Sequence, residues 1–437
     1  MIRGSITYPK FDTGRRTKSL QGKRSNLLLI LGGCLLVFYA FLGSGATLTV
    51  DINGKIKSVK QAIQLANAGD TILVMPGTYR EGNLLVQKSL TILGRNFPVL
   101  DGEGKYEIFT VTANHVTISG FRLVDTGRAS INDLAAVKGL DVTRLRVINN
   151  KFENAFFGIH LSNSNNCTVE GNTLAGGSGV NVEHDTGNGI HFWKCDHMTV
   201  RRNVIERHRD GIYFEFVTKS IVDENLSQGN LRYGLHFMFS HDDDYINNTF
   251  RNNGSGAAVM YTKGVKMIGN RFEDNWGSAT YALLLKDIGD SRIEKCVFIR
   301  NTVAIYMEGS SRIMIQENEF RQNGWAMKIQ ASCDDNVITR NNFVANTFDI
   351  STNGSISLNS ITRNYWDRYE GYDLNRDGVG DVPFHPVSLY GMIVEKMPTA
   401  VMLWRSFLVF LLDRTERVLP VVTPENLKDD FPAMKLL

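Results

Sequence analysis

A chain of 437 residues with 43% hydrophobic and 10% aromatic content can bury a large core. Its formal net charge is +3, which gives no support for a nucleic-acid partner. Its five cysteines are scattered without a C-x-x-C spacing, so zinc and dithiol redox motifs are not indicated.

The N-terminal segment has the pattern of an export signal. Basic residues between 15 and 24 precede an apolar run from Leu27 to Leu42, and Ser44-Gly-Ala46 follows as an A-x-A-like cleavage site. The run is about 16 residues, short for a membrane span. Residues 1–46 are therefore predicted to be a signal peptide or, alternatively, an uncleaved N-terminal anchor. Either reading places the rest of the chain outside the cytoplasm.

The next element, Ser58–Ala66, is amphipathic and predicts a short helix. It directly precedes a long series of β-type repeats. A stack of β-coils must cover its first coil, because an open end exposes strand edges and core. We therefore expect this helix to be an N-terminal cap.

From residue 150 one short phrase returns, usually after 22 or 23 residues: Asn, a variable residue, then an apolar or aromatic residue. Its first residues are Asn150, Asn172, Asn203, Asn225, Asn248, Asn270, Cys296, Asn318, Asn341 and Asn364. Such a period indicates a solenoid, and coils of short β-type runs without a helical pattern indicate a parallel β-helix, which we expect to be right-handed. It is predicted over residues 47–368, followed by a C-terminal region over 369–437.

Stacking of coils explains the repeated residues. Apolar side chains would form an internal column, and the Asn amides would hydrogen-bond from coil to coil. Cys296 would be a buried, inert thiol. The one step of 31 residues, from Asn172 to Asn203, is one coil plus a loop at Gly176–Gly187.

A second phrase, such as Gly189-Ile-His191, also repeats. Because side chains alternate along a strand, its third residue and the residue two positions later should both point outward, and they form two columns along the solenoid. The first is expected to contain His160, His191, Tyr213, His236, Val259, Leu284, Tyr306 and Lys328. The second is expected to contain Ser162, Trp193, Glu215, Met238, Tyr261, Lys286, Glu308 and Gln330, which leaves Met260 on the inward side. Aromatic and apolar residues on an outer face indicate a contact surface. The predicted binding surface is His191, Trp193, Tyr213, Glu215 and Tyr261, unless a loop or the C-terminal tail packs over it.

The densest group of candidate ligands on this face is His236-Phe-Met238-Phe-Ser-His241. His236 and Met238 are two residues apart on one strand face, and His241 follows in the turn. Imidazole and thioether are soft ligands that suit Cu(I), so these three residues are candidate ligands for transiently bound copper. Ordinary surface histidines are the alternative.

Two acidic clusters near this face, Asp242–Asp244 and Glu183–Asp185, permit a different function. A polysaccharide lyase or epimerase needs paired acid and base groups in a groove. A carbohydrate-active β-helix is therefore the alternative hypothesis, although solvated turns explain both clusters equally well.

After Trp366 the repeat ends. Side chains with oxygen atoms recur at alternate positions, with a glycine where the loop must turn; they are Asp373, Asn375, Asp377 and Asp381. This resembles the start of an EF-hand loop without its final Glu, so a calcium-stabilised turn competes with a metal-free Asp/Gly turn.

Tyr390–Leu412 is apolar but interrupted by Arg405. It predicts a helical tail that docks on a membrane partner or the bilayer surface, or else caps the last coil.

Several longer motifs are specific enough to compare with known families. They are Gly234-Leu-His-Phe-Met-Phe-Ser-His241, Ala258-Val-Met-Tyr261, Leu283-Leu-Leu-Lys-Asp287, Asn364-Tyr-Trp-Asp367 and Gly371–Pro383. With them the chain resembles the NosD family, periplasmic maturation proteins for nitrous-oxide reductase. The resemblance implies a non-enzymatic component of a complex with a cytoplasmic ABC ATPase and a membrane permease, supporting assembly of the reductase's copper–sulfide centre. A copper chaperone and the reductase would be further partners, and the delivered species, copper or sulfur, stays open.

Overall fold

The computed structural model describes residues 45–129, 133–177, 186–278, 280–354, 358–418 and 427–437, all within one compact unit. The leader predicted over residues 1–46 lies outside this part of the chain except for its last two residues. The core of the predicted loop at Gly176–Gly187, residues 178–185, also lies outside it.

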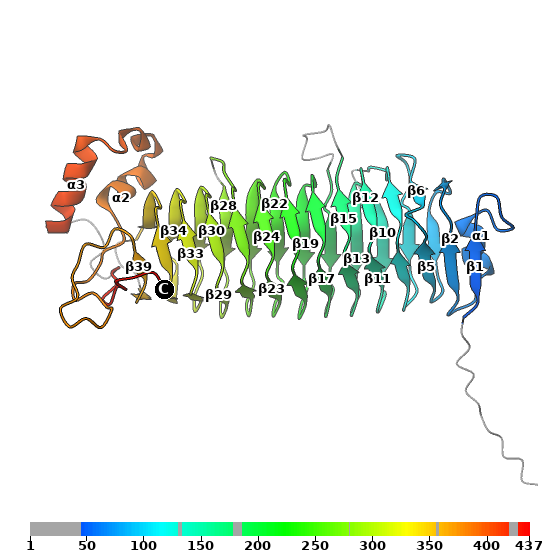
Figure 1. Ribbon diagram of the computed structural model, residues 1–437, viewed down its shortest axis with the longest axis horizontal. Coiled ribbons are helices and arrows are strands. Elements are labelled where there is room, and N and C mark those ends of the chain that lie inside the picture. Colours follow the sequence, from blue (N-terminus) through cyan, green and yellow to red (C-terminus); the bar gives the residue numbers. More distant parts are fainter. Residues whose placement is uncertain (1–44, 130–132, 178–185, 279, 355–357, 419–426) are drawn as a thin grey trace, which may run out of the picture. The chain divides into compact units, whose positions relative to one another are not determined.

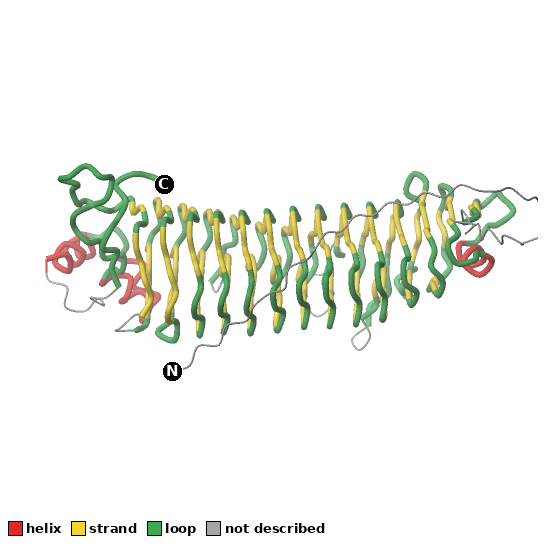
Figure 2. The backbone as a smooth tube through the Cα atoms, turned by 90° about the horizontal axis from the view of Figure 1, so that it is seen from below, coloured by secondary structure: helices red, strands yellow, loops and turns green. Residues whose placement is uncertain are grey.

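Three parallel sheets wind into one solenoid, in which each full coil contributes one strand to each sheet (Figures 1 and 2). The predicted parallel β-helix is therefore confirmed. Sheet A consists of β1 (Thr47–Val50), β2 (Thr71–Val74), β5 (Thr91–Gly94), β8 (Thr117–Ser119), β11 (Arg146–Ile148), β14 (Thr168–Glu170), β17 (Thr199–Arg201), β20 (Ile221–Asp223), β23 (Asp244–Ile246), β26 (Lys266–Ile268), β29 (Arg292–Glu294), β32 (Met314–Gln316), β35 (Asp334–Thr339) and β38 (Leu358–Thr362).

Sheet B follows sheet A around each coil, and sheet C closes the coil. Sheet B consists of β3 (Thr78–Tyr79), β6 (Val99–Asp101), β9 (Arg122–Val124), β12 (Lys151–Glu153), β15 (Thr173–Ala175), β18 (Val204–Glu206), β21 (Leu226–Gln228), β24 (Thr249–Arg251), β27 (Arg271–Glu273), β30 (Val297–Ile299), β33 (Glu319–Arg321), β36 (Asn342–Val344) and β39 (Tyr365–Trp366). Sheet C consists of β4 (Leu84–Val86), β7 (Phe109–Val111), β10 (Ala135–Leu140), β13 (Phe157–Ser162), β16 (Ile190–Trp193), β19 (Asp210–Glu215), β22 (Tyr233–Met238), β25 (Ser255–Met260), β28 (Tyr281–Lys286), β31 (Val303–Glu308), β34 (Trp325–Ile329) and β37 (Phe348–Thr352).

The repeated Asn residues form a continuous buried ladder at the corner between sheets A and B. Asn203 is typical, because its backbone N–H and its Nδ2 donate to Oδ1 of Asn225 at 3.0 and 2.9 Å. Its Nδ2 also donates to the carbonyl of Val169, one coil earlier, at 3.0 Å. Each Asn thus satisfies buried backbone groups on two neighbouring coils, which explains why the sequence repeats it.

Cys296 interrupts this ladder, as predicted, and is a fully buried free thiol. Burial raises its thiol pKa to about 12, so the thiol stays protonated and unreactive at neutral pH. The internal column is confirmed as well: the rings of Phe272, Phe298 and Phe320 stack with centroids 4.9 and 5.0 Å apart.

A second Asn ladder, which the sequence pattern had not suggested, lies at the corner between sheets B and C. It consists of Asn230, Asn253, Asn275, Asn301, Asn323 and Asn346. Beside this ladder, the repeated phrase of sheet C begins with a small residue, because adjacent coils approach closely there. A Cβ added at Gly234 would lie 2.7 Å from the carbonyl oxygen of Gly256.

The predicted N-terminal cap is helix α1 (Val59–Leu65), with Ser58 as its N-cap. The helix packs against β1, β2 and β4, and it buries Val59, Ala62 and Ile63. The carboxylate of Glu81 accepts from the backbone N–H of Val59 at 2.8 Å and so satisfies a free donor at the helix start. The cap therefore covers the first coils with apolar residues.

At the other end the chain forms α2 (Leu389–Lys396), a 3-10 helix η2 (Pro398–Leu403) and α3 (Phe407–Val418). A small second core joins α2, η2 and α3 to the last strand of sheet C, and it is built from Phe348, Tyr390, Val394, Ala400 and Val409. Lys328 and Glu395 form an ion pair of 2.6 Å across this contact. The tail thus covers the end of sheet C, and part of it also projects from the solenoid.

The final segment, residues 427–437, closes the last coil and was not anticipated from the sequence. Asp429 is fully buried and takes the position that a further Asn would occupy in the first ladder. Its Oδ2 accepts from the backbone N–H of Asn364 at 2.9 Å and from Nε1 of Trp366 at 3.0 Å. A carboxylate therefore ends the ladder by accepting its last donors.

Candidate functional site

The strand pairing of sheet C fixes which residues share its outer face. Tyr213 pairs with His236, and His236 pairs with Ala258, which in turn pairs with Leu284. The sequence analysis had placed Val259 in this column. That assignment was wrong, because Val259 is fully buried in the core and Ala258 takes the position between His236 and Leu284.

The same correction applies to the second column, where Met260 rather than Tyr261 is the neighbour of Met238. Met238 pairs with Met260, and Met260 pairs with Lys286. Both methionines are partly exposed. The prediction that Met260 points into the core was therefore wrong. The signal for the right register was present in Gly256-Ala-Ala258, which repeats Gly234-Leu-His236 at a distance of 22 residues.

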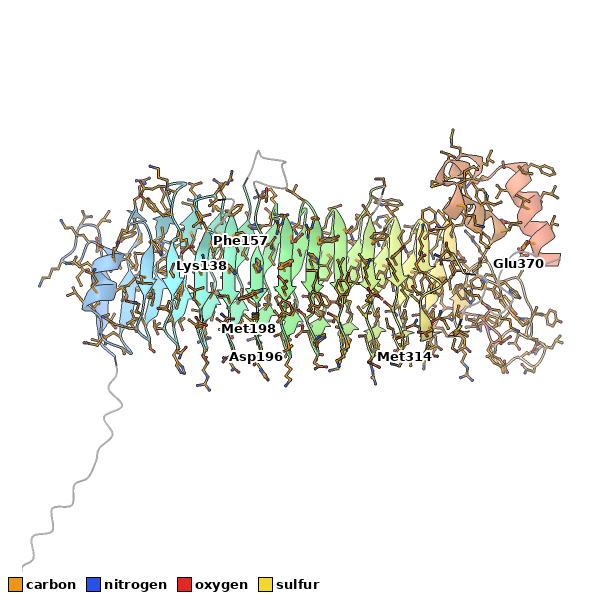
Figure 3. The ribbon with its side chains drawn as sticks, turned by 180° about the vertical axis from the view of Figure 1, so that it is seen from behind. Lys138, Phe157, Asp196, Met198, Met314 and Glu370 are labelled. Atoms are coloured by element: carbon orange, nitrogen blue, oxygen red, sulfur yellow. The ribbon has the colours of Figure 1, made fainter. Side chains whose placement is uncertain are left out.

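Four aromatic rings contact one another in series along the first column, from His160 to His236; the first contact is tilted and the other two are edge-on. The ring centroids are 4.7 Å apart for His160 and His191, 4.7 Å for His191 and Tyr213, and 5.0 Å for Tyr213 and His236. Phe157 covers the first pair, and it is labelled in Figure 3 beside Lys138, which comes from the preceding coil. The structure thus brings His191, Tyr213 and His236 of the predicted surface into direct contact.

His236 is almost fully buried although it lies on the outer face. Its Nδ1 lies 3.0 Å from Nη2 of Arg232 and 3.4 Å from Oδ2 of Asp210, a carboxylate that is itself fully buried. Its Nε2 is buried and has no hydrogen-bond partner among the described residues. Asp210 can only accept, which requires a proton on Nδ1 and leaves the lone pair on Nε2, whereas Arg232 can only donate, which requires the lone pair on Nδ1. In the first tautomer His236 has the arrangement of many metal-binding histidines, in which a carboxylate holds the nitrogen that does not bind the metal.

Met238, the second predicted copper ligand, lies two residues after His236 on β22, on the same face. His241, the third, lies beyond a turn in which Phe239 and Asp242 have positive φ angles of 50° and 58°. It forms a bridge with Thr218, and its Nδ1 accepts from the backbone N–H of Lys263 at 3.3 Å. The strand therefore groups His236 and Met238 with Met260, while His241 belongs to the next corner.

The remaining predicted surface residues are also placed on or beside this face. Trp193 pairs with Glu215 on the neighbouring strand, and Glu215 accepts from the hydroxyl of Tyr213 at 3.3 Å. Tyr261 is 40% exposed at the edge of the face. Its ring stacks on that of Phe239 at 5.1 Å.

The acidic residues that would support a carbohydrate-active site are arranged differently from a catalytic pair. Asp243 is fully buried, its Oδ1 accepts from the backbone N–H of Ser220 at 2.8 Å, and burial raises its pKa to about 8. Asp244 pairs with Lys266 at 3.0 Å. A buried carboxyl group cannot contact a polymer in a groove. Glu183 and Asp185 lie outside the described residues.

The candidate calcium loop is closed by its own hydrogen bonds. Asp373 accepts from the backbone N–H groups of Asp377 and Gly378 at 3.2 and 2.9 Å. Asp377 accepts from Val379 at 2.8 Å, and Asp381 accepts from Leu374 at 2.6 Å. Asn375 accepts from the backbone N–H of Asp377 at 3.0 Å. The side-chain oxygens thus fix an Asp/Gly turn through its backbone N–H groups, and calcium binding at this turn stays a prediction. Within the described ranges, no group of three or more His, Cys, Asp or Glu side chains is placed to bind a metal ion.

The C-terminal helices present a large apolar surface, which we call the arm patch. It consists of Val401, Met402, Leu403, Phe407, Leu408, Phe410 and Leu411, which are between 43% and 87% exposed. Of the helices in the described residues, none is long and apolar enough to span a membrane. Exposed apolar patches of this kind mark contact sites with other proteins or with lipid.

Comparisons with known proteins agree with the sequence motifs. Residues 176–371 match the family model described as "Periplasmic copper-binding protein (NosD)". A protein of Stutzerimonas stutzeri named "Probable ABC transporter binding protein NosD" is 25% identical over 90% of this chain and 94% of its own length. A protein of the same name from Pseudomonas aeruginosa is 27% identical over 81% of this chain and 86% of its own length.

Solved structures support the fold alone. PfbA, a surface adhesin of Streptococcus pneumoniae, superposes with a TM-score of 0.53 at 12% identity, over 71% of this chain and 88% of that chain. Tailspike protein 3 of bacteriophage CBA120 gives a TM-score of 0.51 at 12% identity, over 77% and 64%. These structural likenesses show the fold alone. The sequence is similar to NosD proteins: residues 176–371 match the NosD family model, and two proteins named NosD align with most of the chain.

Proposed function

We propose that this protein is a non-enzymatic periplasmic accessory protein that binds Cu(I) transiently on the outer face of sheet C. In this proposal it supports maturation of nitrous-oxide reductase. It would act with an ABC ATPase, a membrane permease, a copper chaperone and the reductase itself. The observation that carries the proposal is the grouping of His236, Met238 and Met260 on one outer face.

The ligand set fits a monovalent soft cation. Thioethers bind Cu(I) and discriminate against hard divalent ions, and they need no deprotonation. In the tautomer in which Nδ1–H of His236 donates to Asp210, the lone pair at Nε2 supplies the third donor. Partial exposure of both methionines leaves the cation accessible, as a carrier that must release its cargo requires.

Copper binding is tested by anaerobic titration of the full-length protein with Cu(I) against a chromophoric Cu(I) chelator. Met238→Leu combined with Met260→Leu keeps the apolar volume and removes both sulfur atoms. We expect at least a tenfold loss of affinity at this site. His197→Ala is the matched control, since its ring is half-exposed and pairs with Asp196 away from the candidate ligands. Unchanged affinity in the double variant would remove this ligand assignment.

The arm patch supports docking on the membrane component. Phe407 and Phe410 are 77% and 56% exposed, on a helix that reaches the solenoid through the small second core. Burying two such rings contributes on the order of 3–5 kcal/mol to an interface. A permease surface or the adjoining bilayer would provide the apolar partner.

Docking is tested by affinity purification from solubilised membranes. Phe407→Ser with Phe410→Ser should abolish co-purification of an ATPase and a permease. Leu374→Ser, at a residue 79% exposed in the Asp/Gly turn, should leave it unchanged. Point substitutions are needed here, because truncation after Tyr390 would also remove Asp429 and open the last coil. Equal recovery of both membrane components with all variants would disprove the docking role.

A further inference from the structure

A second group of possible donors lies at the other end of the series of rings, at His160 on β13 and His191 on β16. The two imidazoles are neighbours in register, with centroids 4.7 Å apart and planes tilted by 31°. Phe157 lies against both, with its centroid 5.9 Å from His160 and 5.4 Å from His191. Tyr213 separates this pair from His236.

Buried ring nitrogens normally form hydrogen bonds within the protein, but this pair includes a nitrogen that does not. His160 is 9% exposed, and its Nδ1 is buried without a hydrogen-bond partner among the described residues. An unsatisfied buried polar atom of this kind is costly, and a bound ion or an ordered water would satisfy it. Burial lowers the pKa of both histidines, so both rings are neutral at pH 7 and each has one free lone pair.

Asn188 is placed to set the tautomer of His191. It is fully buried, its Nδ2 lies 3.4 Å from Nδ1 of His191, and its Oδ1 has no partner within the described structure. A half-turn of the amide, which exchanges two atoms of nearly the same size, would let Oδ1 accept from Nδ1–H of His191. The lone pair of His191 would then lie on Nε2, as in histidines whose second nitrogen is held by a hydrogen bond.

We propose that His160 and His191 form a second soft-cation site, which binds Cu(I) between two imidazoles one coil apart. This inference rests on the proposed copper-handling function and adds a site to it. The carboxylate of Glu107, two coils before His160, is already engaged by Lys138 at 2.7 Å and by the hydroxyl of Thr110 at 2.8 Å. Two neutral imidazole nitrogens are a sufficient ligand set for a monovalent soft cation.

Stoichiometry tests the proposal on the full-length protein, titrated with Cu(I) alone under anaerobic conditions. His160→Phe with His191→Phe keeps two rings in contact and removes their nitrogens. Tyr213→Phe is the matched control, because it keeps the ring between the two sites and adds no donor. We expect two Cu(I) per chain in the unchanged protein and in the control. We expect one in the double His variant, one in Met238→Leu/Met260→Leu, and none when the four substitutions are combined.

The outcomes separate this inference from the proposed function. A single Cu(I) in the unchanged protein that disappears with the two methionines would overturn the second site and leave the first intact. Binding of Zn(II) with equal affinity at the histidine pair would overturn its assignment to Cu(I). X-ray absorption of copper-loaded Met238→Leu/Met260→Leu gives an answer that does not depend on folding of the His variants. A first shell of nitrogen alone supports the pair, and absence of bound copper refutes it.

Discussion

The closure of the last coil makes a prediction whose size can be worked out from its hydrogen bonds. In Asp429→Ala, three donors lose their acceptor: the backbone N–H of Arg363, now at 2.9 Å from Oδ1, and the backbone N–H of Asn364 and Nε1–H of Trp366, now at 2.9 and 3.0 Å from Oδ2. Nδ2 of Asn364 keeps the carbonyls of Ile338 and Thr362. An unsatisfied buried donor costs about 1–3 kcal/mol. Allowing for water that enters the vacated space, the loss should be on the order of 3–5 kcal/mol for the last coil.

The loss should be local at first, because a solenoid unfolds from an unprotected end. Urea unfolding followed by circular dichroism gives the stability, and hydrogen exchange at residues 358–366 shows where the loss occurs. Asp430→Ala is the matched control, since Asp430 is half-exposed and pairs only with Lys428 at 2.8 Å among the contacts found. Asp429→Asn retains one acceptor oxygen and should lose about half as much. Equal stability of Asp429→Ala and Asp430→Ala would refute the reasoning.

Three further predictions follow from buried groups elsewhere in the solenoid. Cys296→Asn would give the amide of Asn270 an oxygen acceptor in place of the sulfur at 4.0 Å. The free energy of unfolding measured in urea should therefore rise by about 1 kcal/mol, and no rise, or a fall, would show that the site cannot hold an amide. The pKa of Asp243 is about 8 in the folded chain against 3.8 for the free group, so its contribution is full below pH 4 and is lost as the pH rises through 8. Asp243→Asn keeps the acceptor for Ser220, and its stability advantage over the unchanged protein should grow between pH 4 and pH 8; a constant difference would contradict the assignment. Burial lowers the pKa of His208 to about 4 from 6.5, so its contribution is full above pH 6.5 and is lost as the pH falls through 4. Relative to His208→Phe, the unchanged protein should lose about 3 kcal/mol between pH 6.5 and pH 4, and a constant difference between the two proteins would contradict the reasoning.

The period of the sequence was sufficient to predict the solenoid, because each coil needs the same residues at the same places. Asn at the first corner and an aromatic residue two positions later both satisfy contacts between adjacent coils. The second Asn ladder carries an equally regular signal, five residues after the first, as in Asn225 and Asn230. It was overlooked although it is visible in the sequence.

Other features had weaker signals. Met260 was misassigned because Ala258 is too small to mark an outward position, so the register was counted from the larger Val259. Asp429 could not have been predicted from the repeat, since 65 residues without a coil separate it from Asn364. The environment of His236 depends on Asp210, one coil earlier, and such a pairing across coils requires the exact register.

The first Asn ladder also has a direction. Apart from the break at Cys296, the backbone N–H and one Nδ2–H of each Asn point to the amide oxygen of the next coil, from Asn150 toward Asn364. The aligned peptide and amide dipoles therefore add, with their positive end at the last coil. Asp429 places a negative charge at that end, as an acidic residue does at the N-terminus of an α-helix. The solenoid thus terminates electrostatically as well as sterically, and an amide at this position would satisfy the geometry without supplying the charge.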